Sequence, residues 1–83
     1  MKTVFSDEGW EDYCSWSGDR KILQRINRMV AEAKREPGVG IGKPERLTAN
    51  LSGYWSRRID DEHRLVYTAK GDELIIIQAR YHY

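Results

Sequence analysis

Cysteine and metal-binding patterns are nearly absent from this sequence of 83 residues. Its one cysteine, Cys14, excludes an internal disulfide and is typical of a reducing compartment. The two histidines, His63 and His82, stand at none of the spacings that bind a structural metal. We therefore expect neither a disulfide framework nor a metal site, and no cofactor.

Long hydrophobic runs are missing as well. No stretch approaches the roughly 18 apolar residues of a membrane span, and no signal segment opens the chain. A chain of this length has a modest core, which buries roughly 60–65% of the surface that the unfolded chain exposes. We expect a single cytoplasmic domain over residues 1–83, without a membrane partner and without room for a large cofactor.

The net charge is small, +1 at pH 7, but it is unevenly distributed. Residues 1–19 are acidic, whereas the segment from Arg20 to Arg80 carries thirteen of the fourteen lysines and arginines against eight acids. This skew weakly favours an anionic partner over one part of the surface.

The first half of the chain predicts a short strand and two helices. Residues 1–5 form the strand, and Ser6 caps a helix to about Trp16. In that helix Trp10 and Trp16 are interpreted as core aromatics, and Cys14 as a small core residue. A second helix runs from 20 to about 36. Its single apolar face comprises Ile22, Leu23, Ile26, Met29, Val30 and Ala33. The basic residues around that face are interpreted as solvated, with phosphate contact as the alternative.

The second half predicts a loop and then a sheet. Gly38–Gly42 has glycines at alternate positions but not the spacing of a phosphate-binding P-loop, so we interpret it as a shaped loop of open role. The β-rich runs 54–59, 63–69 and 73 to about 81 are joined by short turns and predict an antiparallel meander. The expected fold class is α+β. Two N-terminal helices pack on one face of a small, mainly antiparallel sheet, which the first strand joins.

An arginine and the last four residues are candidate functional groups. Arg64 lies in a strand where an unpaired charge is expensive to bury. Either it forms a salt bridge with Glu45 or another acid, or its guanidinium is free to grip a phosphate. The run 74–77 leads into Arg80-Tyr81-His82-Tyr83, which offers a cation, aromatics that stack on bases and a histidine that moves protons.

Glu45, Arg64 and His82 together suit a ribonuclease that needs no metal. The glutamate would take the proton from a ribose 2′-OH, the arginine would hold the phosphorane, and the histidine would protonate the leaving 5′-oxygen. Tyr81 and Tyr83 would stack on or position nucleotides. This hypothesis requires the three side chains to meet on one concave surface.

Several motifs resemble the YoeB/Txe toxins of the RelE superfamily. They are Lys43-Pro44-Glu45, Asn50-Leu51-Ser52-Gly53, Tyr54-Trp55-Ser56-Arg57-Arg58-Ile59, Glu62-His63-Arg64-Leu65-Val66-Tyr67 and Arg80-Tyr81-His82-Tyr83. The opening, with Trp10 and Tyr13, also matches, whereas the helix surfaces and Gly38–Gly42 diverge. The resemblance covers nearly the whole chain. It implies a RelE-like, microbial-RNase-like fold and a ribosome-dependent mRNA interferase, the toxin of a bacterial type II toxin–antitoxin pair.

The resemblance also implies roles and partners. Such toxins cut mRNA in the ribosomal A site, and their base matches Glu45, their phosphate-binding arginine Arg64, and their acid histidine and terminal tyrosine His82 and Tyr83. The implied partners are a YefM/Phd-like antitoxin with an acidic C-terminal segment, mRNA on the ribosome, and a second copy in a homodimer. We add four candidate RNA contacts, Lys43, Arg58, Arg80 and Tyr81.

Two other functional classes stay open. A small basic module could bind RNA and block translation without cutting it, which would use Tyr81 and Tyr83 but not Glu45. A structural partner could serve only in antitoxin-bound complexes that bind an operator. Growth arrest that Glu45→Ala relieves would favour catalysis, whereas arrest that it leaves unchanged would favour the RNA-binding module. Codon preference, the antitoxin's identity and the stoichiometry are not encoded in any motif that we recognise.

Overall fold

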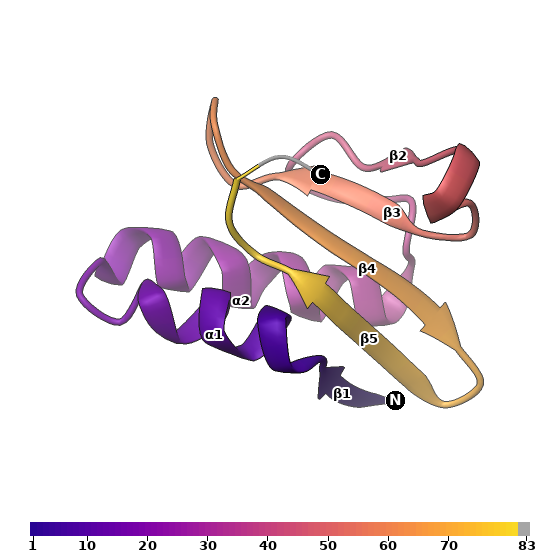
Figure 1. The fold of residues 1–83 in the computed structure, drawn as a ribbon, viewed down its shortest axis with the longest axis horizontal. Coiled ribbons are helices and arrows are strands. Elements are labelled where there is room, and N and C mark those ends of the chain that lie inside the picture. The colour runs from indigo at the N-terminus through magenta and orange to yellow at the C-terminus, as the bar shows by residue number, and fades with distance from the viewer. Residues whose placement is uncertain (82–83) are drawn as a thin grey trace.

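Two helices and a five-stranded sheet make up residues 1–81, the part of the chain that the computed structural model describes. In chain order the elements are β1 (Lys2–Phe5), α1 (Asp7–Ser15), α2 (Arg20–Arg35), β2 (Glu45–Arg46), a 3-10 helix (Ala49–Leu51), β3 (Trp55–Arg58), β4 (Arg64–Lys70) and β5 (Glu73–Gln78). Across the sheet the strands lie in the order β1-β5-β4-β3-β2 (Figure 1).

The strand pairing confirms the predicted meander and the α+β class. β3 pairs antiparallel with β4, and β4 pairs antiparallel with β5. β1 joins the sheet parallel to β5, as expected for the first strand. β2 was not predicted; it pairs antiparallel with β3 and forms the far edge. This short strand brings Glu45 into the sheet, where the sequence had indicated only a loop.

Helix α2 packs on the sheet as its periodicity predicts. Ile26, Met29 and Ala33 are fully buried against Leu65 and Tyr67 on the inner face of the sheet. The helix begins where expected, because the Asp19 carboxylate accepts a hydrogen bond from the N–H of Ile22 at 3.1 Å. The same rule holds at α1, where the Ser6 hydroxyl accepts from the N–H of Gly9 at 3.0 Å.

Gly9 explains how closely α1 approaches the sheet. A Cβ at this position would lie 2.4 Å from the carbonyl oxygen of Ile76 in β5, a distance that real Cβ atoms do not adopt. The glycine that weakens the helix by propensity is therefore what lets the helix backbone reach β5. Trp16 lies two turns further on the same side, and it is buried as expected.

Two predicted core residues of α1 are exposed instead. Trp10 is 51% exposed and Cys14 lies on the surface. The buried side of α1 is the one that carries Gly9, so Trp10, the next residue, projects from a different side of the helix. Its ring stacks on Tyr13 at 5.7 Å between centroids and meets Phe5 edge-on. The interpretation of Trp10 and Cys14 as core residues was wrong.

The last strand also ends earlier than predicted, at Gln78 instead of about residue 81. The cause is α1, which takes both backbone groups of the next residue. The N–H of Ala79 donates to the Asp12 carboxylate at 3.0 Å, and the carbonyl of Ala79 accepts from the indole N–H of Trp16 at 2.7 Å. With these groups occupied, Ala79 cannot continue the ladder.

Among the described residues, no helix has the length and apolar composition needed to cross a membrane.

Candidate functional site

The sheet register places Glu45, Arg58 and Arg64 on one face, opposite the helices. Glu45 pairs with Ser56 in β3, and Arg58 pairs with Arg64 in β4. Directly paired residues share a face, and so do residues two apart along a strand. The alternate residues, such as Leu65, lie in the helix-packed core. From strand spacing alone, the Cα atoms of Glu45 and Arg64 are about 12 Å apart, within reach of two side chains that converge on one phosphate.

The pairing of Arg58 with Arg64 is unfavourable unless an anion lies near. Like charges directly opposite on neighbouring strands destabilise a sheet. Within residues 1–81, neither arginine forms an ion pair with a carboxylate, and the salt bridge between Arg64 and Glu45 considered above is not formed. Among the described residues, the Arg64 guanidinium donates a hydrogen bond to the carbonyl of Asp60, at 3.4 Å. Two cations therefore stand beside an exposed carboxylate, an arrangement that suits a phosphodiester.

Lys43 lies at the edge of this face. Its backbone is in the left-handed region, with φ 49°, after Gly42 at φ 87°. The carbonyl of Gly42 accepts a hydrogen bond of 2.7 Å from the N–H of Arg58, which ties this turn to β3. Lys43 is exposed, and the turn carries its side chain to the same end of β3 as Arg58.

The chain beyond β5 holds the remaining predicted residues. Tyr81 is 58% exposed, with its ring available to a base. Arg80 lies toward α1 instead, because its guanidinium covers the Trp16 ring at 4.0 Å and donates to the Ser15 hydroxyl at 2.8 Å. The structure therefore does not bring Arg80 to Glu45. His82 and Tyr83, predicted as general acid and terminal tyrosine, lie outside the described residues.

Ser56 is a residue of this face that the motifs alone did not single out. It stands between Glu45 and Val66 in the cross-strand row, and its side chain is 2% exposed. Its hydroxyl oxygen has no hydrogen-bond partner among residues 1–81. A buried hydroxyl without a partner costs about 1–3 kcal/mol. Only its position in the alternating strand, two residues before Arg58, could have indicated that it faces the site.

Arg57 is the second residue that the sequence reasoning missed, and it has a structural role. Its guanidinium is completely buried on the helix side and organises the loop that follows α2. It donates to Tyr67 Oη at 2.7 Å and to the carbonyls of Ile41 at 3.0 Å and Val39 at 2.7 Å. Two longer bonds, each of 3.2 Å, reach the carbonyls of Glu36 and Pro37. The role left open for Gly38–Gly42 is therefore to wrap this cation.

Glu32 and Tyr67 complete the surroundings of Arg57. The carboxylate of Glu32 lies 3.5 Å from the guanidinium and accepts from the N–H of Ile41 at 2.7 Å. The bond from Ile41, followed by the bond from Arg28, lowers the pKa of Glu32 below its usual value of 4.5. Burial raises the pKa of Tyr67 above 10.0, which keeps the phenol protonated, and its hydroxyl donates to the carbonyl of Pro37.

The basic residues of α2 have mixed roles. Arg25 donates to the carbonyls of Ile59 at 2.8 Å and Arg58 at 3.0 Å, and thereby holds the end of β3. Arg28 pairs with Glu32 at 3.0 Å. Arg25 is therefore engaged within the fold, which neither interpretation describes, whereas Arg28 is 65% exposed and agrees with the solvated-face interpretation.

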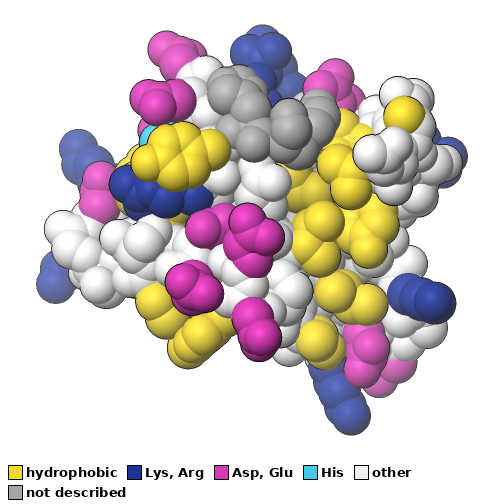
Figure 2. Space-filling model, in the orientation of Figure 1, with side chains coloured by type: hydrophobic (Ala, Val, Ile, Leu, Met, Phe, Trp, Pro, Cys, Tyr) yellow, Lys and Arg dark blue, Asp and Glu magenta, His cyan; other side chains and the backbone are white. Residues whose placement is uncertain are grey.

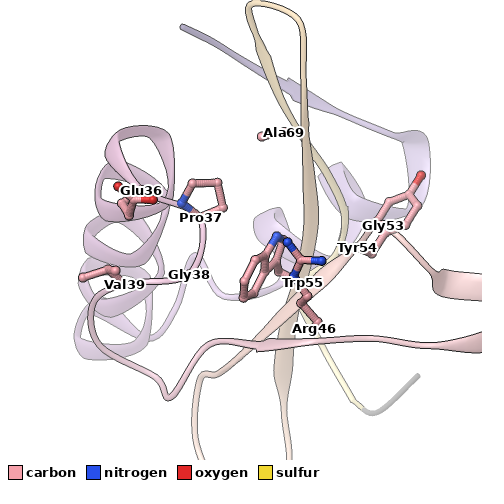
Figure 3. A pocket seen from close by; sticks show the side chains of 9 residues that line it. All are labelled: Glu36, Pro37, Gly38, Val39, Arg46, Gly53, Tyr54, Trp55 and Ala69. Atoms are coloured by element: carbon pink, nitrogen blue, oxygen red, sulfur yellow. The ribbon is translucent and has the colours of Figure 1, made fainter.

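A groove of about 530 Å³ lies on the helix side of the β2–β3 edge. Figure 3 shows Trp55 and Arg46 on the sheet across from Pro37 and Gly38 at the end of α2. The Arg46 guanidinium covers the Trp55 ring at 5.2 Å. Because Arg46 and Trp55 are cross-strand partners on the inner face, the groove opens on the opposite side of the sheet from Glu45 and Arg64.

The surface charge also separates by region. Figure 2 shows Asp and Glu side chains gathered over the region of α1. The helix contributes Asp7, Glu8, Glu11 and Asp12 to this acidic surface. This acidic surface disfavours an anion, whereas the arginines Arg58 and Arg64 lie on the other face of the sheet. Within residues 1–81, no three His, Cys, Asp or Glu side chains lie close enough together to hold a metal ion.

Two helices packed on a five-stranded, mostly antiparallel sheet form a RelE-like toxin fold, which the solved toxins described below share. Residues 5–83 match the family described as the YoeB-like toxin of bacterial type II toxin–antitoxin systems, and the chain belongs to that family. Toxin YoeB of Streptomyces coelicolor is 58% identical over 84 residues, with all of both chains covered.

Solved structures agree with this assignment. A YoeB/ParE toxin from Agrobacterium tumefaciens superposes with a TM-score of 0.95 at 45% identity, with all of both chains covered. The Staphylococcus aureus protein, solved as a YoeB dimer and in a YoeB–YefM complex, gives TM-scores of 0.91 and 0.90 at 42% and 41% identity. In both cases all of this chain and 98% of the S. aureus chain are covered.

Proposed function

We propose that this toxin is an endoribonuclease that cleaves mRNA on the ribosome and thereby stops translation. The observation that carries the proposal is the outer face of the sheet, where Glu45 lies exposed beside the like-charged pair Arg58 and Arg64. An anion between the two arginines would relieve their mutual repulsion, and the adjacent carboxylate supplies a base. The reaction needs no metal ion in this scheme.

The chemistry divides among the residues as follows. Glu45 takes the proton from the 2′-OH, and the resulting alkoxide attacks the adjacent phosphorus. Arg64, helped by Arg58, holds the negative phosphorane. His82 protonates the 5′-oxygen as its bond to phosphorus breaks, and Tyr83 positions the scissile group. Lys43, Arg80 and Tyr81 are assigned to the flanking RNA; of these Arg80 would first have to leave Trp16.

Dependence on the ribosome follows from the modest charge. A net charge of +1 gives little attraction for free RNA at physiological salt, so positioning must come from elsewhere. A ribosome that holds the mRNA in place would supply it, since correct orientation is worth many powers of ten in rate. The protein would therefore work in the cytoplasm, as one domain over residues 1–83.

The partner proposed is a YefM-type antitoxin with an acidic C-terminal segment. It is supported by the S. aureus relative, which is solved in complex with YefM, and by the arginines of the outer face, which such a segment would neutralise. A homodimer is proposed on the same basis, from the S. aureus YoeB dimer.

Cleavage of mRNA by programmed ribosomes tests the function. We expect wild-type protein to cut within the A-site codon and Glu45→Gln to cut about 10²–10⁴-fold more slowly, the usual contribution of a positioned general base. Glu8→Gln, an exposed acid on α1, is the matched control and should cut at the wild-type rate. Co-sedimentation with ribosomes should be equal for all three proteins.

The outcomes separate the alternatives. Equal cleavage by Glu45→Gln and the wild type would remove the glutamate from the mechanism. A wild type that blocks translation without cutting, and does so unchanged in Glu45→Gln, would establish the non-catalytic RNA-binding module instead.

A further inference from the structure

His63 forms a hydrogen bond with the backbone of Tyr81, close to the C-terminus. The imidazole is 8% exposed, and its Nδ1 accepts a hydrogen bond of 2.7 Å from the N–H of Tyr81. Its ring meets Trp16 edge-on at 4.9 Å and lies 5.1 Å from the Tyr81 ring. To accept at Nδ1, the imidazole must be neutral with its proton on Nε2. This buried histidine has no role in the chemistry proposed above.

Further bonds hold the same three residues of chain. Ala79 is bonded through both backbone groups to Asp12 and Trp16, and Arg80 covers Trp16. The carbonyl of Tyr81 accepts from the N–H of Arg64 at 3.0 Å. Residues 79–81 are thus attached on one side to α1 and on the other to the first residue of β4, which is the proposed phosphate ligand.

Tyr81 itself adopts a strained backbone. Its φ is 61°, in the left-handed region that residues with a side chain rarely occupy. Such a conformation persists only where the surroundings over-determine it, and it is often found at functional sites. The bonds from the N–H of Arg64 and, at 3.1 Å, from the side-chain amide of Gln78 hold its carbonyl, and the bond to His63 holds its N–H.

We propose that His63 is a positioning residue for the cleavage reaction. Its Nδ1 fixes the peptide of Tyr81, the residue that directly precedes the proposed general acid His82 in the chain. Arg64 has two roles, because its side chain is the proposed phosphate ligand and its backbone N–H donates to the carbonyl of Tyr81. The inference rests on the proposed function, since it concerns how the general acid is presented to the RNA.

Two substitutions test separately the hydrogen-bond acceptor of His63 and the shape of its ring. Asparagine carries an oxygen on Cγ, where histidine carries Nδ1, so His63→Asn keeps the acceptor and loses the ring. Phenylalanine keeps a flat ring against Trp16 and loses the acceptor, so His63→Phe leaves the Tyr81 N–H without a partner. Glu62→Gln, exposed in the same turn, is the control.

We expect His63→Phe to lower the rate of cleavage on programmed ribosomes about 10- to 100-fold, as a displacement of roughly 1 Å would. His63→Asn should stay within a few-fold of the wild type, and ribosome co-sedimentation should be unchanged in both. Amide hydrogen exchange of Tyr81 should accelerate in His63→Phe and not in His63→Asn. If His63→Phe fails to fold, Trp16→Phe, which removes the bond to Ala79, should show the same loss of rate with retained ribosome binding.

The remaining outcomes overturn the proposal. Full activity of His63→Phe, or an equal loss in the Asn and Phe variants, would show that the Nδ1 acceptor does not position the terminus. Parallel loss of binding and cleavage would make the histidine a docking or folding residue. A wild-type protein without cleavage activity would refute the proposed function, whereas the exchange measurement reports on the Tyr81 bond by itself.

Discussion

Replacing Arg57 by methionine should be among the most destabilising single changes in this protein. The methionine fills a similar volume but removes every donor from a completely buried site. The carbonyls of Ile41 and Val39 and the hydroxyl of Tyr67 lose their partner, and Glu32 loses its buried counter-charge. Breaking a buried charged network costs about 3–5 kcal/mol. A domain of this size has a total free energy of unfolding of about 4–12 kcal/mol.

The assay is thermal and urea unfolding of Arg57→Met beside the wild type. A loss of about 3 kcal/mol lowers Tm by at least about 12 °C in a domain of this size. Arg58→Met is the matched control, because the neighbouring arginine is exposed on the other face and changes stability by no more than about 0.5 kcal/mol. The order of the two variants should reverse in the RNA-cleavage assay, where Arg58→Met should be the one that cuts more slowly. A Tm of Arg57→Met within about 3 °C of the wild type would show that the loop does not depend on this cation.

Three further predictions concern packing, pH and the terminus. Gly9→Ala should destabilise the protein by about 1–3 kcal/mol, although alanine has the better helix propensity, because the added Cβ meets the Ile76 carbonyl. Urea unfolding measures this loss, and an unchanged midpoint would contradict that contact. The pKa of Glu32 is held below its usual 4.5, so its contribution to stability is present above that pH and is lost as the pH falls through the folded value. Glu32→Gln should therefore flatten the fall of stability below pH 4.5, and equally steep curves would exclude this contribution. His82→Ala should keep its Tm and ribosome binding while cleavage falls about 10²–10⁴-fold, and a fully active variant would remove the histidine from the mechanism.

Much of the fold follows from the sequence because local rules decide it. The apolar spacing of α2 admits only one buried face, and Ile26, Met29 and Ala33 are buried as that spacing requires. The caps at Ser6 and Asp19 form as their side chains dictate. The meander follows from three β-rich runs joined by short turns, which leave antiparallel pairing as the only short connection.

The residues of the candidate site were predicted from sequence motifs, and not from any expected geometry. Glu45 and Arg64 are 19 positions apart, and their place on one face depends on β2, a two-residue strand too short to be seen in a pattern. Alternation along β3 could have separated Arg57 from Arg58, since neighbours in a strand face opposite ways. It could not have shown which of the two is buried, because that depends on where the helices lie.

Only the tertiary structure decided the surroundings of the terminus. Trp10 and Trp16 share a helix and a residue type, yet the close approach of Gly9 to β5 turns one outward and the other into the core. The strand that the apolar run predicts stops at Gln78, because Asp12 and Trp16 take the backbone groups of Ala79. These partners are more than 60 positions apart in the chain. Local propensity has no access to contacts between residues so distant, and they exist only once helix and sheet have packed.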